Sequence, residues 1–537
     1  MSSFASLLVV VIALLQLSIP ARATQNDGES MREGGTTDWP SLRFHFKLKR
    51  SSMNIYGQDD FSVYANPLVS ANGSRVLYDI SATFREDATV YNYTLVNGVA
   101  YLLSSTQIAG SATSTVQYLS SELDDFPPIN AIASALNDAT PIPSVSRSAR
   151  DSINCTAGNV YKASVSGFDF AVCAASNSGL MMYSRNVDIA VEYLASHVNI
   201  VPPRMHANQL RDCKAEVESS KVTSTGKTLL TRKLLAMNPS RKLAAEISLW
   251  FEHDTTCSCK STPRPCIFIH GLGVENETPE NEDSLTYWGD ITNHAPCCTS
   301  IKYTHLNTIN TTWMNVTQQQ KVCDRALAVS NTSTDFLIND TILVTHSMGG
   351  LMLAGALANG LCALSSSSTW ISTAAPMRGS MGSDYAQDTC AGRTNFLAET
   401  LAAYKNQCPV STASKSVVYE DGSYSSVYLK VAYKAAQEAY RKNVSALMCS
   451  ESFSGILSSY QASFWVLGHL IPHKSDKNDG VVEFQSCSTG IPASKFGNTY
   501  TDRFYRTKLN HYDMQFRAGD AFLNKAKMPL KWFECLL

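Results

Sequence analysis

The sequence predicts an α/β fold for the second half of the chain, preceded by a β-rich domain. Three observations lead to this prediction. An apolar run reaches a turn of small residues around Ser347 and is followed by a helical pattern. A second apolar run ends in a glycine-containing loop that begins at His270. Before about residue 215, apolar and polar residues alternate with period two, which is typical of half-buried strands.

The segment around Ser347 has the pattern of a strand, a sharp turn and a helix. The segment Thr341–His346 has the apolar residues Ile342, Leu343 and Val344 at its centre, and a helical pattern rich in glycine and alanine follows from Gly349 to Gly360. Such a turn lifts a serine hydroxyl above the sheet and directs a helix N-terminus at it, so Ser347 is the predicted nucleophile. The usual pattern is Gly-x-Ser-x-Gly, and here Thr345 replaces the first glycine. The alternative is that Ser347 is an ordinary helix N-cap.

The segment Pro265–Gly273 predicts the other half of an ester-cleaving site. Its apolar run ends in His270-Gly-Leu-Gly273. A loop of this kind, placed before the nucleophile in the chain, supplies one backbone N–H of an oxyanion hole, and the residue after the nucleophile supplies the other. The predicted donors are the N–H groups of Leu272 and Met348.

The acid and the histidine of a catalytic triad should follow the serine in that order. His511 is the histidine that lies well past an acid and near the end of the chain, whereas the chain would aim His346 away from the site. The acid is predicted to be Asp479, on a turn before Gly480, with Asp476 as the alternative. Asp479 would hold the imidazole tautomer, and His511 would take the serine proton and return it to the leaving group.

The chain from about residue 246 to the end resembles a lipase-type α/β-hydrolase. It is similar to secreted bacterial triacylglycerol lipases and to the lipase-like catalytic domain of glycosylphosphatidylinositol inositol deacylases. Five segments in the same order carry this resemblance: His270-Gly-Leu-Gly273, His346-Ser-Met-Gly-Gly350, Ala375-Pro-Met-Arg-Gly-Ser380, Asn478-Asp-Gly-Val-Val482 and Asn510-His-Tyr-Asp513. The resemblance implies an α/β-hydrolase fold with a helical cap at about 383–460 and cleavage of lipid acyl esters.

The resemblance also bears on metal binding. In calcium-dependent bacterial relatives, an aspartate two residues past the catalytic histidine binds a structural ion, and Asp513 matches it. The glutamine ligand expected four residues later is replaced by Arg517. We therefore expect no metal and no cofactor, and a structural hydrogen-bonding role for Asp513.

The charge and composition of the chain limit the classes of partner that it is expected to bind. The chain has 537 residues, a net charge of −2 and only 17% charged residues, and it has no basic stripe for nucleic acid. The expected partners are a lipid or other ester substrate and, peripherally, a lipid interface. The oligomeric state is left open.

The N-terminus and the cysteines predict secretion. The apolar run Leu7–Leu15 is too short to span a membrane, and Ala21-Arg-Ala23 suits signal-peptide cleavage, so residues 1–23 are a predicted signal peptide. Fifteen cysteines indicate disulfides rather than metal sites. Cys155 and Cys173 are a possible pair. The odd number leaves at least one thiol free or bonded to another chain, and Cys266 is a candidate for a buried free thiol. Nine sequons are candidate glycosylation sites: Asn72, Asn92, Asn154, Asn276, Asn310, Asn315, Asn331, Asn339 and Asn443.

The predicted domains are a β-rich domain at 24–215, a linker at 216–245 and the hydrolase domain at 246–537. The first is expected to be an antiparallel sheet on a short helix at Ile129–Leu136, either a half-barrel for an apolar ligand or a plain interaction domain. The linker contains two dibasic pairs, Arg232-Lys233 and Arg241-Lys242, as possible processing sites. Two helices are expected in the cap, Phe396–Tyr404 and Val427–Tyr440.

Together these features predict a secreted serine carboxylic-ester hydrolase that forms an acyl-enzyme on Ser347. Inositol deacylase-like, thioesterase and peptidase activities are alternatives on the same machinery. A non-catalytic secreted binding protein is the alternative of another class, although an intact serine, acid and histidine argue against it.

Overall fold

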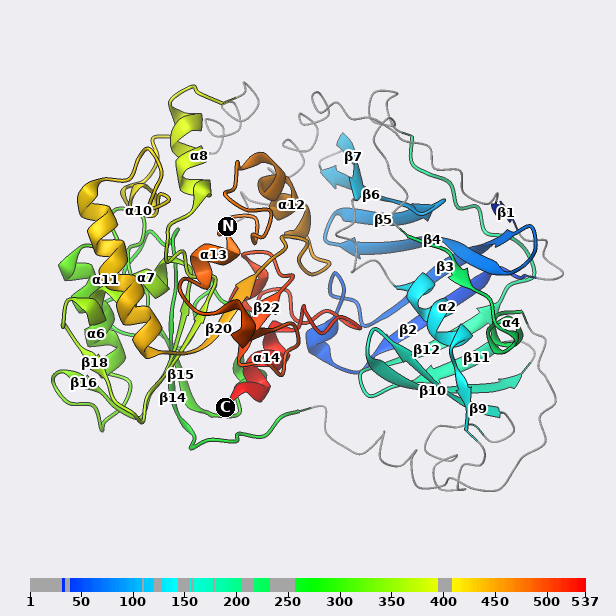
Figure 1. Ribbon diagram of the computed structural model, residues 1–537, viewed down its shortest axis with the longest axis horizontal. Helices are drawn as coiled ribbons and strands as arrows, with labels where there is room; N and C mark the ends of the chain where they lie inside the picture. The colour runs from blue at the N-terminus through cyan, green and yellow to red at the C-terminus, as the bar shows by residue number, and fades with distance from the viewer. Residues whose placement is uncertain are drawn as a thin grey trace. The chain divides into compact units, whose positions relative to one another are not determined.

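The computed structural model describes residues 31–33, 39–108, 111–119, 128–142, 155, 159–176, 179–204, 217–231, 256–394 and 408–537. The chain divides into two compact units, each with its own large sheet (Figure 1). The first unit comprises Met1–Thr255 with Ala521–Asn524, and the second comprises Thr256–Asp520 with Lys525–Leu537.

The first unit is built on a 13-stranded antiparallel sheet. Its main path runs β7-β6-β5-β4-β3-β2-β12-β11-β10-β9-β8, with β1 on β3 and β13 on β4. The strands are β1 (Met31–Glu33), β2 (Leu42–Leu48), β3 (Asp60–Ser70), β4 (Arg75–Glu86), β5 (Thr89–Val96), β6 (Val99–Ile108), β7 (Ser111–Leu119), β8 (Thr140–Pro141), β9 (Asn159–Val165), β10 (Phe168–Ser176), β11 (Gly179–Tyr183), β12 (Val187–Tyr193) and β13 (Ser220–Lys221).

Alternation of apolar and polar residues explains these strands. In β2, Leu42, Phe44 and Phe46 are fully buried, while the two residues between them are partly exposed. The predicted helix at Ile129–Leu136 is confirmed as α2 (Ile129–Asn137). The side chain of Asn130 ties it to the sheet, because its amide bonds both the N–H and the carbonyl of Tyr78 on β4, at 2.8 and 3.1 Å.

Part of the expected linker belongs to this unit. Residues 217–231 include β13 and the helix α4 (Ser224–Leu230), which is capped by the side chain of Thr223. Leu229 and Leu230 are fully buried. The expectation of a linker from residue 216 is therefore wrong for this stretch: its Ser, Thr and Lys residues suggested a linker, but two leucines anchor it. The two dibasic pairs lie outside the described residues.

The second unit contains a seven-stranded, entirely parallel sheet in the order β15-β14-β17-β19-β20-β22-β21, and a two-stranded sheet of β16 and β18. Its strands are β14 (Arg264–Ile269), β15 (Cys298–Tyr303), β16 (Leu337–Ile338), β17 (Ile342–His346), β18 (Ala363–Leu364), β19 (Thr369–Thr373), β20 (Val444–Ser450), β21 (Phe496–Gly497) and β22 (Phe504–Thr507). Its described α-helices are α6 (Val316–Leu327), α7 (Met348–Ala358), α8 (Met381–Cys390), α10 (Thr412–Ser416), α11 (Val427–Asn443), α12 (Gln461–Leu470), α13 (Phe484–Cys487) and α14 (Pro529–Leu536).

The core of this unit lies between the central strands and α7. Every residue of β17 and of β19 is buried, as expected for central strands of a parallel sheet covered on both faces. The helix α7 is apolar on all sides and is buried from Met348 to Ala356, with α6 and α11 packed against it (Figure 1). The Ser347 turn therefore stands between two rigid, fully packed elements.

The predicted fold class is wrong. The chain was expected to be an α/β-hydrolase fold with a helical cap behind a β-rich domain, but its largest sheet is antiparallel, and strands hold 31% of the described residues against 25% for helices. Helix-rich α/β architecture does not describe this molecule. The misleading signal came from short motifs, which report the local geometry of turns at strand ends and carry little information on the composition of the whole chain.

The expected cap at about 383–460 is also corrected. The helix predicted at Val427–Tyr440 is confirmed as α11, but it packs on α7 and leads directly into β20, a strand inside the parallel sheet. Much of the range therefore belongs to the sheet and its covering layer. The helix expected at Phe396–Tyr404 lies outside the described residues.

Seven disulfides join described cysteines: Cys155–Cys173, Cys257–Cys535, Cys259–Cys297, Cys266–Cys298, Cys323–Cys362, Cys390–Cys408 and Cys449–Cys487. The first confirms the possible pair. The prediction of a free thiol at Cys266 is wrong. The neighbouring strands β14 and β15 place the Cα atoms of Cys266 and Cys298 5.3 Å apart, and the two cysteines form a disulfide. Cys213 and the predicted signal peptide lie outside the described residues. Seven disulfides are consistent with a secreted protein. Of the helices that the structure describes, none has the length and apolarity needed to cross a membrane.

Eight of the nine sequon asparagines are described, and none of the eight is buried. Five are exposed, namely Asn72, Asn276, Asn310, Asn315 and Asn331, and three are partly exposed, namely Asn92, Asn339 and Asn443. Asn154 lies outside the described residues. Burial therefore excludes none of these eight as a glycosylation site.

Candidate active site

Ser347 occupies a strained turn between β17 and α7. Its φ angle is +54°, a region that side-chain-bearing residues rarely adopt. Two glycines allow the close packing around this turn. A Cβ added at Gly349 would lie 2.5 Å from the carbonyl oxygen of Ile269, and one at Gly350 would lie 2.7 Å from the Cβ of Ala375. These clashes explain why the sequence has glycine at both positions.

Thr345, which replaces the first glycine of the usual pattern, fits because the neighbouring strand accommodates its side chain. It is fully buried, and its hydroxyl accepts a hydrogen bond of 3.0 Å from the indole Nε1 of Trp370 on β19. The buried threonine is thus satisfied in its hydrogen bonding, and the turn keeps its shape without a glycine at this position.

The structure brings Ser347, His511 and Asp479 together in one chain of hydrogen bonds. The Oγ of Ser347 lies 3.0 Å from Nε2 of His511, and Nδ1 of His511 lies 2.7 Å from Oδ2 of Asp479. All three residues are buried, with exposed fractions of 6%, 8% and 1%. The alternative acid, Asp476, is exposed, and the carboxylate that meets the histidine is that of Asp479. The geometry is that of a triad, while the catalytic roles remain predictions.

The carboxylate of Asp479 is held on both sides. Its Oδ1 accepts hydrogen bonds from the backbone N–H groups of Val481 and Val482, at 2.9 and 2.7 Å, which leaves Oδ2 for the histidine. The backbone N–H of His511 also donates to the carbonyl of Asp479, at 3.0 Å. The acid and the histidine are therefore joined through both main chain and side chain.

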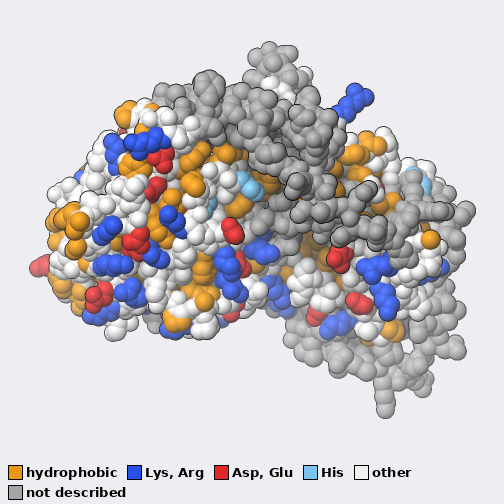
Figure 2. Space-filling view, turned by 45° about the horizontal axis from the view of Figure 1, so that its top comes forward, with side chains coloured by type: hydrophobic (Ala, Val, Ile, Leu, Met, Phe, Trp, Pro, Cys, Tyr) orange, Lys and Arg blue, Asp and Glu red, His pale blue; other side chains and the backbone are white. Residues whose placement is uncertain are grey.

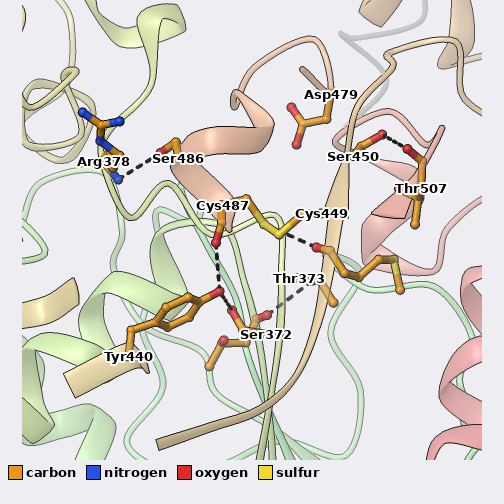
Figure 3. Close-up of a disulfide and its surroundings, with 12 residues drawn as sticks. Ser372, Thr373, Arg378, Tyr440, Cys449, Ser450, Asp479, Ser486, Cys487 and Thr507 are labelled. Atoms are coloured by element: carbon orange, nitrogen blue, oxygen red, sulfur yellow. Dashed lines mark hydrogen bonds between the residues drawn. A yellow bond between two sulfur atoms is a disulfide. The ribbon is translucent and has the colours of Figure 1, made fainter. Parts of the chain in front are cut away.

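The acid turn is anchored in the sheet by a disulfide. Figure 3 shows Cys487, on α13 just after the acid turn, bonded to Cys449 on β20. Next to this disulfide, the backbone N–H of Arg378 donates to Ser486 at 2.9 Å. The apolar run Phe464–Leu467 before the turn belongs to the helix α12, and the strand that precedes the acid in the chain is β20.

Asp513 and Arg517 are structural residues of the histidine loop. Oδ2 of Asp513 accepts hydrogen bonds from the N–H groups of Ile456 and Asn510, at 2.8 and 3.2 Å. Arg517 donates to the carbonyl of Thr286 at 2.8 Å and lies over the ring of Tyr512. Among the residues that the structure describes, no group of His, Cys, Asp and Glu is arranged to hold a metal ion.

The predicted oxyanion loop lies directly beside the nucleophile. A Cβ added at Gly271 would be 2.6 Å from the Cβ of Ser347, so only glycine permits this approach. The carbonyl of Gly271 accepts two hydrogen bonds, from Nδ1 of His270 at 2.9 Å and from the hydroxyl of Thr308 at 2.8 Å. Because the peptide is trans, these bonds turn the N–H of Leu272 the opposite way and hold it there. No hydrogen bond recorded for the described residues occupies the N–H of Leu272 or of Met348.

The neutral imidazole of His270 holds this loop in place through two hydrogen bonds. Its Nε2 accepts from the N–H of Leu306 at 3.1 Å, so its Nδ1 carries the hydrogen donated to Gly271. The ring is fully buried, and this burial lowers the pKa of His270 from 6.5 to about 4. The imidazole stays uncharged at neutral pH, as both hydrogen bonds require.

Sequence reasoning missed two residues behind the triad, His346 and Tyr287. The Nε2 of His346 donates to the backbone carbonyl of His511 at 3.0 Å, so its Nδ1 is the acceptor of the Tyr287 hydroxyl, at 2.7 Å. A Cβ at Gly271 would lie 2.7 Å from the same hydroxyl. Burial lowers the pKa of His346 well below 6.5, which keeps this network neutral. The pattern His-Ser places His346 next to the nucleophile, but no sequence signal pairs it with Tyr287.

Tyr287→Phe is expected to lower kcat about tenfold for a soluble ester while KM changes little. The substitution leaves Nδ1 of the buried His346 without its donor, which costs about 1–3 kcal/mol in local order at the His511 loop. Steady-state kinetics of the purified variant measure the effect. Tyr440→Phe is the matched control, since it removes another buried tyrosine hydroxyl, bonded to Ser372 and Cys487. A fall in kcat in both variants alike would contradict a specific role for Tyr287.

The chain matches no model of a known protein family, and a comparison with curated protein sequences finds no relative. The geometry of the site is therefore the main basis for any statement about function.

Proposed function

We propose that this protein is a secreted serine carboxylic-ester hydrolase that cleaves acyl esters of lipids through an acyl-enzyme on Ser347. One observation carries the proposal. The serine hydroxyl lies 3.0 Å from one ring nitrogen of His511, and the other ring nitrogen lies 2.7 Å from the carboxylate of Asp479. A nucleophile, a base within reach of it and an acid that orients the base are what acyl transfer requires.

The reaction follows from this geometry. Ser347 Oγ would attack the acyl carbonyl carbon as its proton moves to Nε2 of His511. The carbonyl oxygen would become anionic near the N–H groups of Leu272 and Met348. The C–O bond would then break, with the proton of His511 passing to the leaving alkoxide. Water, deprotonated by His511, would attack the acyl-enzyme, release the acid and restore the serine.

A lipid substrate is supported by the resemblance to lipases and by the apolar helix next to the triad. Phe464 on α12 contacts Gly480, which follows the acid, and packs on Tyr512, which follows the histidine. Two further apolar side chains of α12, Trp465 and Leu467, are partly exposed. An acyl chain bound at Ser347 would meet an apolar surface here. The same three residues would also cleave a thioester or the inositol acyl chain of a glycosylphosphatidylinositol. Turnover measured on a panel of substrates distinguishes these activities.

The test is labelling with a fluorophosphonate probe combined with turnover of p-nitrophenyl esters of short and long acyl chains. We expect the wild-type protein to be labelled and to hydrolyse the esters, and the Ser347→Ala variant to do neither. A preference for long chains supports a lipase, and a preference for short chains an esterase. A folded wild-type protein without label or turnover would sink the proposal and favour a non-catalytic binding protein.

A further inference from the structure

The N-terminal turns of α11 carry an apolar surface that the core does not use. Val427 is 80% exposed, Tyr428 is 70% exposed and Val431 is 64% exposed, the three highest values among the large apolar side chains of the described residues. Residues four apart share a helix face, so Val427 and Val431 lie one above the other, with Tyr428 beside them. We call these three side chains the α11 patch.

Lysines border the α11 patch. Lys430 and Lys434 are both exposed and are four residues apart on the same helix. Lys434 lies 3.4 Å from the buried carboxylate of Glu420, and 69% of its side chain remains exposed. The nearest acid further along the exposed face is Glu438, one turn beyond Lys434. Figure 2 shows hydrophobic side chains beside Lys and Arg side chains along the rim where Figure 1 places α11.

The α11 patch lies at the same edge of the parallel sheet as Ser347. The helix ends at Asn443 and β20 begins at Val444, so the end of α11 is at the edge where β20 starts. At about 1.5 Å per residue, 17 helical residues span about 25 Å, the length of a strand of seven residues. The first turn of α11 therefore returns to the opposite edge, where β17 ends and Ser347 begins. An isolated bridge between Ser380, seven residues past the end of β19, and Val418, nine residues before the start of α11, is consistent with this placement.

We propose that the α11 patch docks this protein on an anionic lipid bilayer. Two valines and a tyrosine suit insertion at the headgroup boundary, because tyrosine has an apolar ring and a polar tip. Lys430 and Lys434 supply the charge that complements acidic headgroups. This inference rests on the proposed function, because docking matters for catalysis only if Ser347 cleaves lipid esters. Docking at this edge would bring lipid esters to the side of the sheet that holds Ser347. Val316 is also exposed, but the sequon at Asn315 precedes it, so we leave it out of the patch.

The experiment measures binding of the Ser347→Ala protein to vesicles by co-sedimentation, so that no lipid is hydrolysed. The vesicles are phosphatidylcholine alone or phosphatidylcholine with phosphatidylserine. We expect binding to the anionic vesicles and weakening by salt. Replacing the patch with serine (Val427→Ser, Tyr428→Ser and Val431→Ser together) should reduce partitioning at least tenfold. The double variant Lys430→Gln and Lys434→Gln should reduce partitioning into anionic vesicles about thirtyfold. Each lysine contributes about 1 kcal/mol to binding, and about 1.4 kcal/mol corresponds to a tenfold change.

Two matched controls keep the test specific. Phe336→Ser changes another exposed apolar residue, which is 49% exposed, and Lys442→Gln removes a lysine at the opposite end of α11. Both should bind vesicles like the parent protein. Equal binding by the patch variants, no vesicle binding at all, or self-association that the patch variants abolish would each overturn the proposal.

The failure of docking and the failure of the proposed function are distinguishable. Patch variants made on the active protein should keep wild-type turnover of a soluble short-chain ester, because no patch residue contacts the triad. Loss of vesicle binding with normal soluble turnover supports docking through the patch. A protein that binds vesicles through the patch but takes no fluorophosphonate label retains the docking inference and loses the hydrolase.

Discussion

Asp479→Asn is expected to lower kcat for a soluble ester by about 10⁴-fold, with a small change in KM. The carboxylate oxygen that meets His511 at 2.7 Å would be replaced by a neutral amide group. An asparagine can hold the ring, but it does not stabilise the imidazolium that forms when the serine loses its proton, and it allows the wrong tautomer. Because two backbone amides still bind the other oxygen of the side chain, the turn should keep its shape.

Asp476→Asn is the matched control for this prediction. It removes a carboxylate three residues away in the same segment, but this carboxylate is exposed. We expect its kinetics to match the wild type. Comparable losses in both variants would show that the segment is merely sensitive to substitution, and a loss in Asp476→Asn alone would reverse the assignment of the acid.

The free energy of unfolding is expected to fall by about 3 kcal/mol through His270 as the pH decreases from 6.5 to about 4. The folded protein holds this imidazole neutral, with a pKa of about 4, while the unfolded chain takes up the proton near pH 6.5. The unfolded state therefore binds more protons in this window. The stabilisation is complete above pH 6.5, decreases as the pH falls, and changes no further below about pH 4. His346, whose pKa is also lowered by burial, adds to the loss in the same direction.

Urea denaturation of the disulfide-intact protein at several pH values measures this effect, and His270→Gln is the comparison. The variant loses one of the two clamping hydrogen bonds and should be less stable at neutral pH. However, the variant has no titrating group at this position. Between pH 6.5 and 4 its free energy of unfolding should therefore fall by about 3 kcal/mol less than that of the wild-type protein. Parallel curves for the two proteins would contradict a neutral, buried His270.

The main parts of the candidate site were readable from the sequence because each depends on local rules. Ser347 was found because a strand, a sharp turn and a helix require small residues at Gly349 and Gly350. Asp479 and His511 were found from chain order and from their turn contexts. The Tyr287 and His346 pair was not found, because 59 residues separate the two and their hydrogen bond exists only once the loops are packed.

The fold was less well predicted than the site. Alternating strands and α2 were located in the first half, where burial of every second residue imposes the pattern. The fold class was wrong, because the motifs of the second half outweighed the large antiparallel sheet that the alternating strands build. Cys266 was misread because its partner comes from a neighbouring strand, and the sequence contains no direct sign of which strands are neighbours.

The sequence by itself determined which residues form the candidate site, since turn geometry, glycine spacing and the order of serine, acid and histidine are properties of short segments. The tertiary structure alone decided that these segments meet within hydrogen-bond distance, that Asp479 rather than Asp476 reaches His511, and that Gly271 is clamped by His270 and Thr308. The physical reason is the same in each case: contacts between residues distant in the chain depend on how the strands are ordered in the sheet, and local patterns do not encode that order.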